Sequence, residues 1–166
     1  KRNDKYVNTA DTPIFVKGKN LFGLYQARKA IGKQGFVYLV EGQFDVMSLH
    51  RYGVENVIGG SGTAFTSDQV NLILRFTQNV VMIYDADPAG VHAALKNCEL
   101  LLKAGANVKC IRLPKGTDPD EFARLHANDT GDKLKEMTEA FPYALRRMLI
   151  PRGCKDAQVI SDGINK

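Results

Sequence analysis

The chain has 166 residues and a formal net charge of +5, with 44% hydrophobic and 25% charged residues. These fractions are ordinary for a globular domain, and they exclude a disordered or collagen-like chain. A chain of this length can bury a core without disulfides or structural metals. The three cysteines form no CxxC pair and have no zinc-ligand spacing, which indicates a reduced, cytosolic protein.

Neither a secretion signal nor a membrane span is expected. The first residues, KRNDKYVN, lack the apolar stretch of about 7 to 15 residues that a signal peptide needs. No uninterrupted apolar run approaches the ~18 residues of a membrane-spanning helix. Because the sequence does not begin with Met, we expect a fragment of a longer protein.

The charge is unevenly distributed along the chain. Residues 1–35 carry a net charge of +6, residues 36–120 carry −2, and residues 121–166 carry +1. A partner responds to local charge rather than to the sum. The basic segment has two interpretations, a solvated surface or a site for nucleic-acid phosphates, and its charge alone does not choose between them.

Short apolar runs alternate with helical patterns along the chain. Strands are expected at 36–40, 56–58, 80–84 and 108–113, and helices at 45–52, from 66 or 67 to about 77, at 91–103, from 119, and at 141–149. Thr66 or Ser67 is expected to cap the second helix, and Pro119 to open the fourth. This alternation predicts an α/β fold with a mostly parallel sheet and helices on both faces.

Carboxylates follow three of the four expected strands. They form three pairs, Glu41 with Asp45, Asp85 with Asp87, and Asp118 with Asp120. Because ligands of such sheets bind beyond the carboxyl ends of the strands, all six acids are expected at one edge. Crowded carboxylates repel one another unless a cation neutralises them, and oxygen ligands without His or Cys suit Mg²⁺ or Mn²⁺.

Each pair by itself is also explained as a helix cap or a turn, so the metal-site hypothesis depends on their repetition at successive strand ends. The glycine-rich turn at 59–63 lacks GxxxxGK and is not a Walker A motif. Ser61 has no triad partner, and the histidines at 50, 92 and 126 are interpreted as surface or satisfied side chains. Cys98 and Cys110 are expected in the core.

Several motifs, taken in chain order, resemble those of a known family. EGQFD at 41–45, YDADPAG at 84–90 and GTDPDEF at 116–122 resemble a Toprim domain. KYVNTADTPIFVKG at 5–18 and LFGLYQA at 21–27 are similar to the basic subdomain and linker helix of bacterial DnaG-type DNA primases, and VENVIGGSGTAFT at 54–66 is similar to a strand and loop of that family. Ala86 stands where Gly is frequent, and Gly59 to Ser61 replace Ala-Ser-Leu, but neither change removes a carboxylate.

The resemblance covers most of residues 5–137 and implies three parts. Residues 1–34 would be the end of the basic subdomain and the linker helix, 35–127 a Rossmann-like Toprim domain with about four parallel strands, and 128–166 a C-terminal helical segment of the catalytic core. The zinc-binding domain, most of the basic subdomain and the helicase-binding domain of the family are expected outside these residues. We therefore expect this fragment alone to be nearly inactive.

The resemblance also implies a function, the metal-dependent synthesis of short RNA primers on single-stranded DNA during DNA replication. Glu41, Asp85 and Asp87 would be the catalytic acids, and Asp45, Asp118 and Asp120 would complete the site for Mg²⁺ or Mn²⁺. Zinc is implied only in a domain outside this chain. The residues that would contact nucleotide or nucleic-acid phosphates are Lys5, Tyr6, Asn8 and Lys17.

The implied partners are a single-stranded DNA template, NTPs, the RNA primer and a replicative helicase, which would bind a C-terminal domain outside this chain. No membrane partner is implied, and the expected location is the bacterial cytoplasm, at the nucleoid or replisome. Three alternatives remain open: a Toprim domain of a topoisomerase or nuclease, a mobile-element primase, and a module that binds DNA without a metal.

Overall fold

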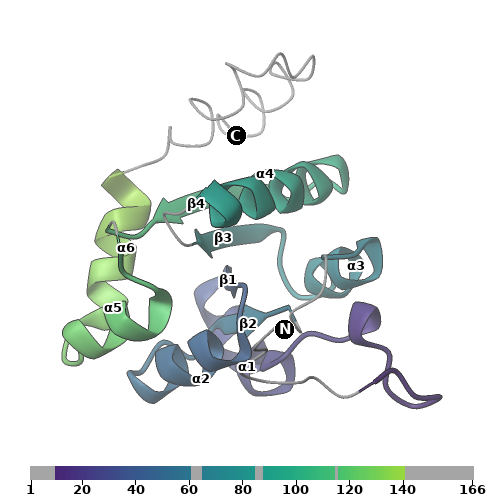
Figure 1. Ribbon diagram of the computed structural model, residues 1–166, viewed down its shortest axis with the longest axis horizontal. Helices are drawn as coiled ribbons and strands as arrows, with labels where there is room; N and C mark the ends of the chain where they lie inside the picture. The colour runs from purple at the N-terminus through teal and green to yellow at the C-terminus, as the bar shows by residue number, and fades with distance from the viewer. Residues whose placement is uncertain (1–9, 61–64, 85–87, 115, 141–166) are drawn as a thin grey trace, which may run out of the picture.

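The computed structural model describes residues 10–60, 65–84, 88–114 and 116–140. Four strands form one sheet: β1 (Val37–Val40), β2 (Val57–Gly59), β3 (Asn79–Tyr84) and β4 (Asn107–Arg112). All pairings are parallel, and the strand order is β2-β1-β3-β4 (Figure 1). The predicted parallel sheet is thus confirmed.

Helices cover both faces of this sheet. They are the short 3₁₀ helix η1 (Lys17–Lys19) and the α-helices α1 (Leu24–Gln34), α2 (Gln43–Arg51), α3 (Ser67–Leu74), α4 (Pro88–Lys103), α5 (Pro119–Leu125) and α6 (Thr130–Ala140). One hydrophobic core lies between the sheet and α1, α3 and α4. A second core lies between the opposite face and α2, α5 and α6.

The two cores follow from the alternation of side chains along each strand. Val37 and Leu39 of β1 enter the first core, and Tyr38 and Val40 enter the second. A strand buried on both faces therefore has an uninterrupted apolar sequence, as β1 has. Cys98 of α4 and Cys110 of β4 are buried in the first core, as the sequence predicted.

The helix ends depend on local hydrogen bonds. The Thr66 hydroxyl accepts a hydrogen bond from the Gln69 backbone N–H at 3.2 Å, so Thr66 is the N-cap of α3, as expected. Pro119 occupies the first turn of α5, where its missing N–H needs no partner. Gly35 ends α1 with a φ of 76°, a left-handed conformation that favours glycine.

Some expected boundaries were wrong. Helix α3 ends at Leu74, so Thr77 is not part of its apolar face; its hydroxyl instead donates to the Gly35 carbonyl at 2.8 Å. Helix α4 begins at Pro88, three residues before the expected start, because proline suits the first turn. The expected helix at 141–149 lies outside the described residues, as does Cys154.

The strand order places a switch point between β1 and β3. The chain runs from β1 outward to β2 and then crosses back to β3 and β4 (Figure 1). In open parallel sheets, ligands bind beyond the carboxyl ends of the two strands where the winding direction changes. In the described part of the chain, no helix is both long and apolar enough to cross a membrane.

Candidate active site

Glu41 directly follows β1 at the switch point. Strands β1 and β3 are parallel, with Leu39 paired to Met82. Extending this register by two residues sets Glu41 beside Tyr84, the last residue of β3. Asp85 is the next residue in the sequence. The Glu41 side chain is exposed, so it is accessible at this edge.

Asp45 lies in the first turn of α2, and its position follows from the EGxxD spacing. One of its carboxylate oxygens, Oδ2, accepts a hydrogen bond of 2.9 Å from the backbone N–H of Gly42, the N-cap residue. A negative charge is also favoured there by the helix dipole. The half-buried Asp45 therefore stabilises the start of α2 directly beside Glu41.

Gly59, at the end of β2, lies against the same turn. A Cβ atom added to Gly59 would lie 2.9 Å from Cγ2 of Val46 and 3.2 Å from the Gly42 carbonyl oxygen. A larger residue would therefore push β2 away from the start of α2. Close packing accounts for this glycine, whereas residues 61–63 of the glycine-rich turn lie outside the described residues.

Tyr84, the last residue of β3 at this edge of the sheet, is almost completely buried. Burial raises the pKa of its phenol to about 12; the nearby Cys110 thiol also raises it, and Arg112 opposes the shift. Tyr84 is therefore neutral at physiological pH and adds no charge to Asp85 and Asp87, which follow it in the sequence. Asp85 and Asp87 themselves lie outside the described residues.

Asp118 and Asp120 belong to the start of α5. Asp118 is the N-cap, and its Oδ1 accepts a hydrogen bond of 2.7 Å from the Glu121 backbone N–H. Asp120 is exposed in the first turn. Helix α5 shares the second core with α2. Asp118 thus has a structural role as a helix cap, whatever further role its charge has.

The described residues do not by themselves form a metal site. Within 10–60, 65–84, 88–114 and 116–140, no group of three or more His, Cys, Asp and Glu side chains lies close enough together to hold an ion. The described members of the predicted set are Glu41, Asp45, Asp118 and Asp120, and all are carboxylates. Their oxygen-only chemistry fits Mg²⁺ or Mn²⁺ and does not fit zinc.

Lys17 lies in η1, which packs on the N-terminal end of α3. The Gln69 side-chain Nε2 donates hydrogen bonds to the Lys17 carbonyl at 3.1 Å and to the Asn20 carbonyl at 2.8 Å. The Thr66 hydroxyl donates to the Gly18 carbonyl. Since α3 follows the carboxyl end of β2, these bonds hold η1 at the edge of the sheet where β1 ends. Lys5, Tyr6 and Asn8 lie outside the described residues.

The sequence did not predict the role of Gln69. The sequence pattern that points to Gln69 is the Thr-x-x-Gln spacing of a capping box, in which the Thr66 N–H donates to Gln69 Oε1 at 3.1 Å. This spacing predicts the hydrogen bond that the side-chain oxygen accepts, but not the two hydrogen bonds that the amide nitrogen donates. The two carbonyls that accept from the nitrogen lie 52 and 49 positions earlier in the chain. Only the folded chain brings them to Gln69.

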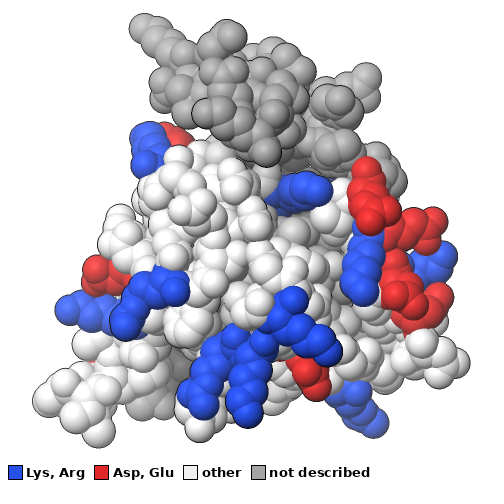
Figure 2. All heavy atoms as spheres, turned by 180° about the vertical axis from the view of Figure 1, so that it is seen from behind, with Lys and Arg blue, Asp and Glu red and all other residues white. Residues whose placement is uncertain are grey.

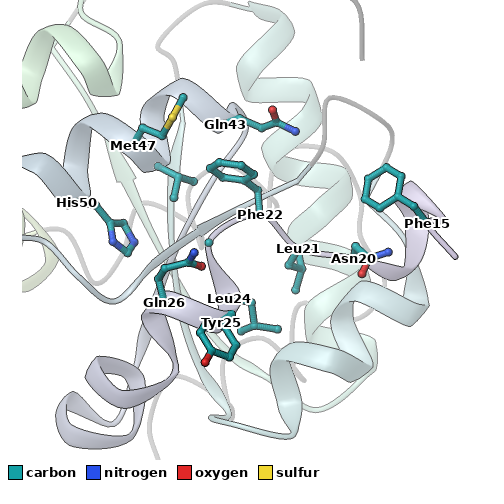
Figure 3. Close-up of a pocket in the computed structure, with 12 residues that line it drawn as sticks. Phe15, Asn20, Leu21, Phe22, Leu24, Tyr25, Gln26, Gln43, Met47 and His50 are labelled. Atoms are coloured by element: carbon teal, nitrogen blue, oxygen red, sulfur yellow. The ribbon is translucent and has the colours of Figure 1, made fainter. Parts of the chain in front are cut away.

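The segment before α1 pairs with the outer edge of β2. Phe22 and Gly59 exchange two backbone hydrogen bonds of 2.9 and 3.0 Å. A pocket of about 530 Å³ lies between this segment and α2. Figure 3 shows its lining, which includes Phe22 and Tyr25 on one side and Gln43 and Met47 on the other. Among the described residues, no predicted site residue lines this pocket, although Gln43 is only two positions from Glu41.

Known proteins are similar to this chain in sequence and in fold. The Toprim-like family matches residues 38–123, slightly more than half of the chain. The chain therefore belongs to the Toprim-like family. Within that class it is similar to a DNA primase of Aquifex aeolicus, with 46% identity over 123 residues, 74% of this chain and 25% of the relative.

Solved primase structures superpose well on the chain. The Aquifex aeolicus primase (zinc-binding and RNA polymerase domains) gives a TM-score of 0.80 at 36% identity, with 99% of this chain and 43% of that chain covered. A DnaG primase catalytic domain bound to ssDNA gives 0.78 at 32% identity, with 94% and 50% covered. The resemblance to DnaG-type primases is thus confirmed, although this chain spans about a quarter of the length of the curated relative.

Proposed function

We propose that this chain is the Toprim part of a DNA primase catalytic core, which makes short RNA primers on a single-stranded DNA template in the bacterial cytoplasm. The observation that carries the proposal is the position of Glu41 beside Tyr84, the residue before Asp85, at the switch point of the sheet. Its support is the similarity to primases at 46% and 36% identity. NTPs, template and primer would be bound by the complete protein.

Glu41, Asp85 and Asp87 are the proposed catalytic acids, and Asp45, Asp118 and Asp120 would complete a site for Mg²⁺ or Mn²⁺. A bound divalent ion supplies neutralisation of the triphosphate and of the attacking and leaving oxygens. The exposed carboxylate of Glu41 is suited to accept the proton of the attacking 3′-hydroxyl. The neutral, buried Tyr84 supports this edge without adding repulsion.

Lys17, together with Lys5, Tyr6 and Asn8, is proposed to contact nucleotide or template phosphates. The backbone of Lys17 is held on both sides: its N–H donates to Asp11 Oδ1 at 3.0 Å, and its carbonyl accepts from Gln69. Both of these bonds use the backbone of Lys17 and not its ammonium group. A compact charge on a fixed backbone at the acidic edge suits a phosphate that approaches the carboxylates.

Calorimetric titration with Mn²⁺ tests the metal site. We expect the chain to bind Mn²⁺ and the Asp85→Asn variant to bind it at least tenfold more weakly, a loss of about 1.4 kcal/mol or more. Asp132→Asn, on the exposed surface of α6, is the matched control and should bind as the parent does. Unchanged binding by Asp85→Asn would refute the site.

Primer synthesis must be measured in the full-length protein, because this chain spans only a quarter of its curated relative. Radiolabelled NTP incorporation on a single-stranded template should require Glu41 and Asp85 but not Asp132. Supercoil relaxation or nicking by the same protein, without primer synthesis, would instead favour a topoisomerase or nuclease.

A further inference from the structure

Helix α1 has a strongly basic outer surface. It contains Arg28, Lys29 and Lys33 and no acidic residue, and all three cationic side chains are exposed. Its buried residues Ala27 and Ile31 pack into the first core, so the cations point away from the sheet. Figure 2 shows a group of Lys and Arg side chains low in the middle of this face of the molecule.

These cations have no acidic partners among the described residues. The ion pairs there join Lys103 to Glu99, Lys133 to Glu136 and His126 to Asp129, all on α4 or later elements. Lys29 and Lys33 are four residues apart and so lie on the same side of α1, about 6 Å apart along its axis. Like charges at this spacing destabilise a helix. For Lys33 this cost is offset by the helix dipole, because Lys33 lies in the last turn of α1, whereas Lys29 lies outside that turn.

An exposed aromatic ring adjoins the cations. The Arg28 guanidinium lies over the Tyr25 ring, with 3.8 Å between Cζ and the ring centroid. Tyr25 is 71% exposed, and it also lines the pocket beside α2. Aromatic rings that stack on bases, next to cations that bind phosphates, are the usual means of holding single-stranded nucleic acid.

We propose that the outer surface of α1, formed by Tyr25, Arg28, Lys29 and Lys33, binds the phosphodiester backbone of a DNA strand while Tyr25 stacks against one base. The proposal rests on the proposed function and adds a contact surface separate from Lys17. Helix α1 begins next to Phe22, which pairs with the carboxyl end of β2, and ends before the amino end of β1. A strand that leaves the carboxylate edge would follow this helix for about 16 Å.

The test is fluorescence anisotropy with a labelled 30-nucleotide oligo(dT), read at several KCl concentrations. The α1 variant combines Arg28→Gln, Lys29→Gln and Lys33→Gln, since glutamine keeps helix propensity while it removes charge. The control variant combines Lys96→Gln, Lys109→Gln and Lys135→Gln, which lowers the net charge equally at exposed positions of α4, β4 and α6. Circular dichroism should show both variants folded.

We expect the α1 variant to bind oligo(dT) at least tenfold more weakly, and its slope of log K against log salt to be shallower by about 2, since each lost phosphate contact removes about 0.7. Tyr25→Ala should weaken binding about fivefold or more, and Tyr25→Phe should not. Equal weakening in the control variant, wild-type binding by the α1 variant, or no binding by the parent chain would each overturn the proposal.

Two further measurements separate this proposal from the proposed function. The α1 variant should keep the Mn²⁺ affinity of the parent, because α1 holds none of the proposed metal ligands. Asp85→Asn should lose Mn²⁺ binding and retain oligo(dT) binding in EDTA. An oligo(dT)·oligo(dA) duplex in place of the single strand shows which form is preferred, and tighter binding of the duplex with no effect of Tyr25→Ala would refute base stacking.

Discussion

Gln69 and Lys17 are joined by a hydrogen bond of 3.1 Å from the Gln69 side-chain amide to the Lys17 carbonyl, across 52 positions of sequence. The same amide donates to the Asn20 carbonyl at 2.8 Å, and the Gln69 side chain is buried. One side chain thereby attaches the basic N-terminal segment to α3 at the carboxyl edge of the sheet. Together with the Thr66–Gly18 hydrogen bond and the Phe22–Gly59 backbone pair, this contact brings the cationic and acidic segments side by side.

Gln69→Glu tests this attachment. The new carboxylate keeps an oxygen that can accept from the Thr66 N–H, but it loses both amide hydrogens and faces two carbonyl oxygens. We expect the free energy of unfolding in urea at pH 7 to fall by about 2 kcal/mol, because buried acceptors lose their donor. Gln78→Glu, at an exposed position, is the control. Equal midpoints for the two variants would show that Gln69 is not an anchor.

Asp118 allows its cap function to be separated from metal binding. Asp118→Ala removes the oxygen that accepts from the Glu121 N–H and should lower the free energy of unfolding by about 1 kcal/mol. Asp118→Asn keeps an acceptor and should change stability little. If Asp118 is also a metal ligand, both variants should bind Mn²⁺ more weakly in calorimetry. Parental Mn²⁺ binding by Asp118→Asn would leave the residue with its structural role alone.

Tyr84 should make the protein sensitive to alkali. Its pKa rises from 10.0 to about 12 on folding, because burial disfavours the phenolate. The unfolded chain therefore loses this proton first, and the stabilisation is complete below pH 10 and is lost as the pH rises toward 12. The loss amounts to about 2 to 3 kcal/mol.

The comparison of Tyr84→Phe with the parent measures the pH-dependent contribution of Tyr84 to the free energy of unfolding. In urea unfolding between pH 9 and 11.5, the free energy of unfolding of the variant should decline less steeply than that of the parent. Tyr25→Phe, which removes an exposed phenol, should decline like the parent. Parallel curves for the parent and Tyr84→Phe would contradict the expectation.

The thiols of the first core should be unreactive in the native protein. The pKa of Cys110 is raised well above its usual value by a hydrogen bond with Cys98 and by burial. Because the thiolate is the reactive form, both thiols should react with DTNB only as fast as the protein unfolds. The measurement uses a Cys154→Ser background so that only these two thiols are present. Rapid labelling of either thiol in native buffer would contradict the burial of Cys98 and Cys110 in the first core.

The strands could be located from the sequence because they are buried on both faces. Such strands have continuous apolar runs, and the runs at 37–40 and 80–84 are unambiguous for that reason. Helix ends were less predictable, as Thr77 shows: its spacing continued the apolar face of α3, but its hydroxyl is bound to Gly35, 42 residues earlier. The helix therefore ends three residues earlier than the spacing of apolar residues predicted, and Thr77, beyond its end, makes a tertiary contact.

In the candidate site too, some features could be predicted from the sequence and others could not. The motif EGxxD spans the end of a strand, a helix N-cap and an acidic residue in the first helical turn, and all three are local features. The position of Asp45 could therefore be predicted from the motif. The start of α5 at Pro119 was equally local, and it leaves Asp118 at the N-cap. The sequence also showed that the net positive charge is concentrated in the first 35 residues, which carry +6 against a total of +5, while residues 36–120 carry −2.

By itself, then, the sequence determined the α/β class and the carboxylates that follow its strands, because burial and capping act within a few residues. Its motifs indicated the family by resemblance. Only the tertiary structure decided that β3 lies beside β1, which sets Glu41 next to Tyr84, and that Gln69 holds Lys17 at the same edge. Those relationships join residues 43 and 52 positions apart. Packing of the sheet and helices, rather than local propensity, selects them.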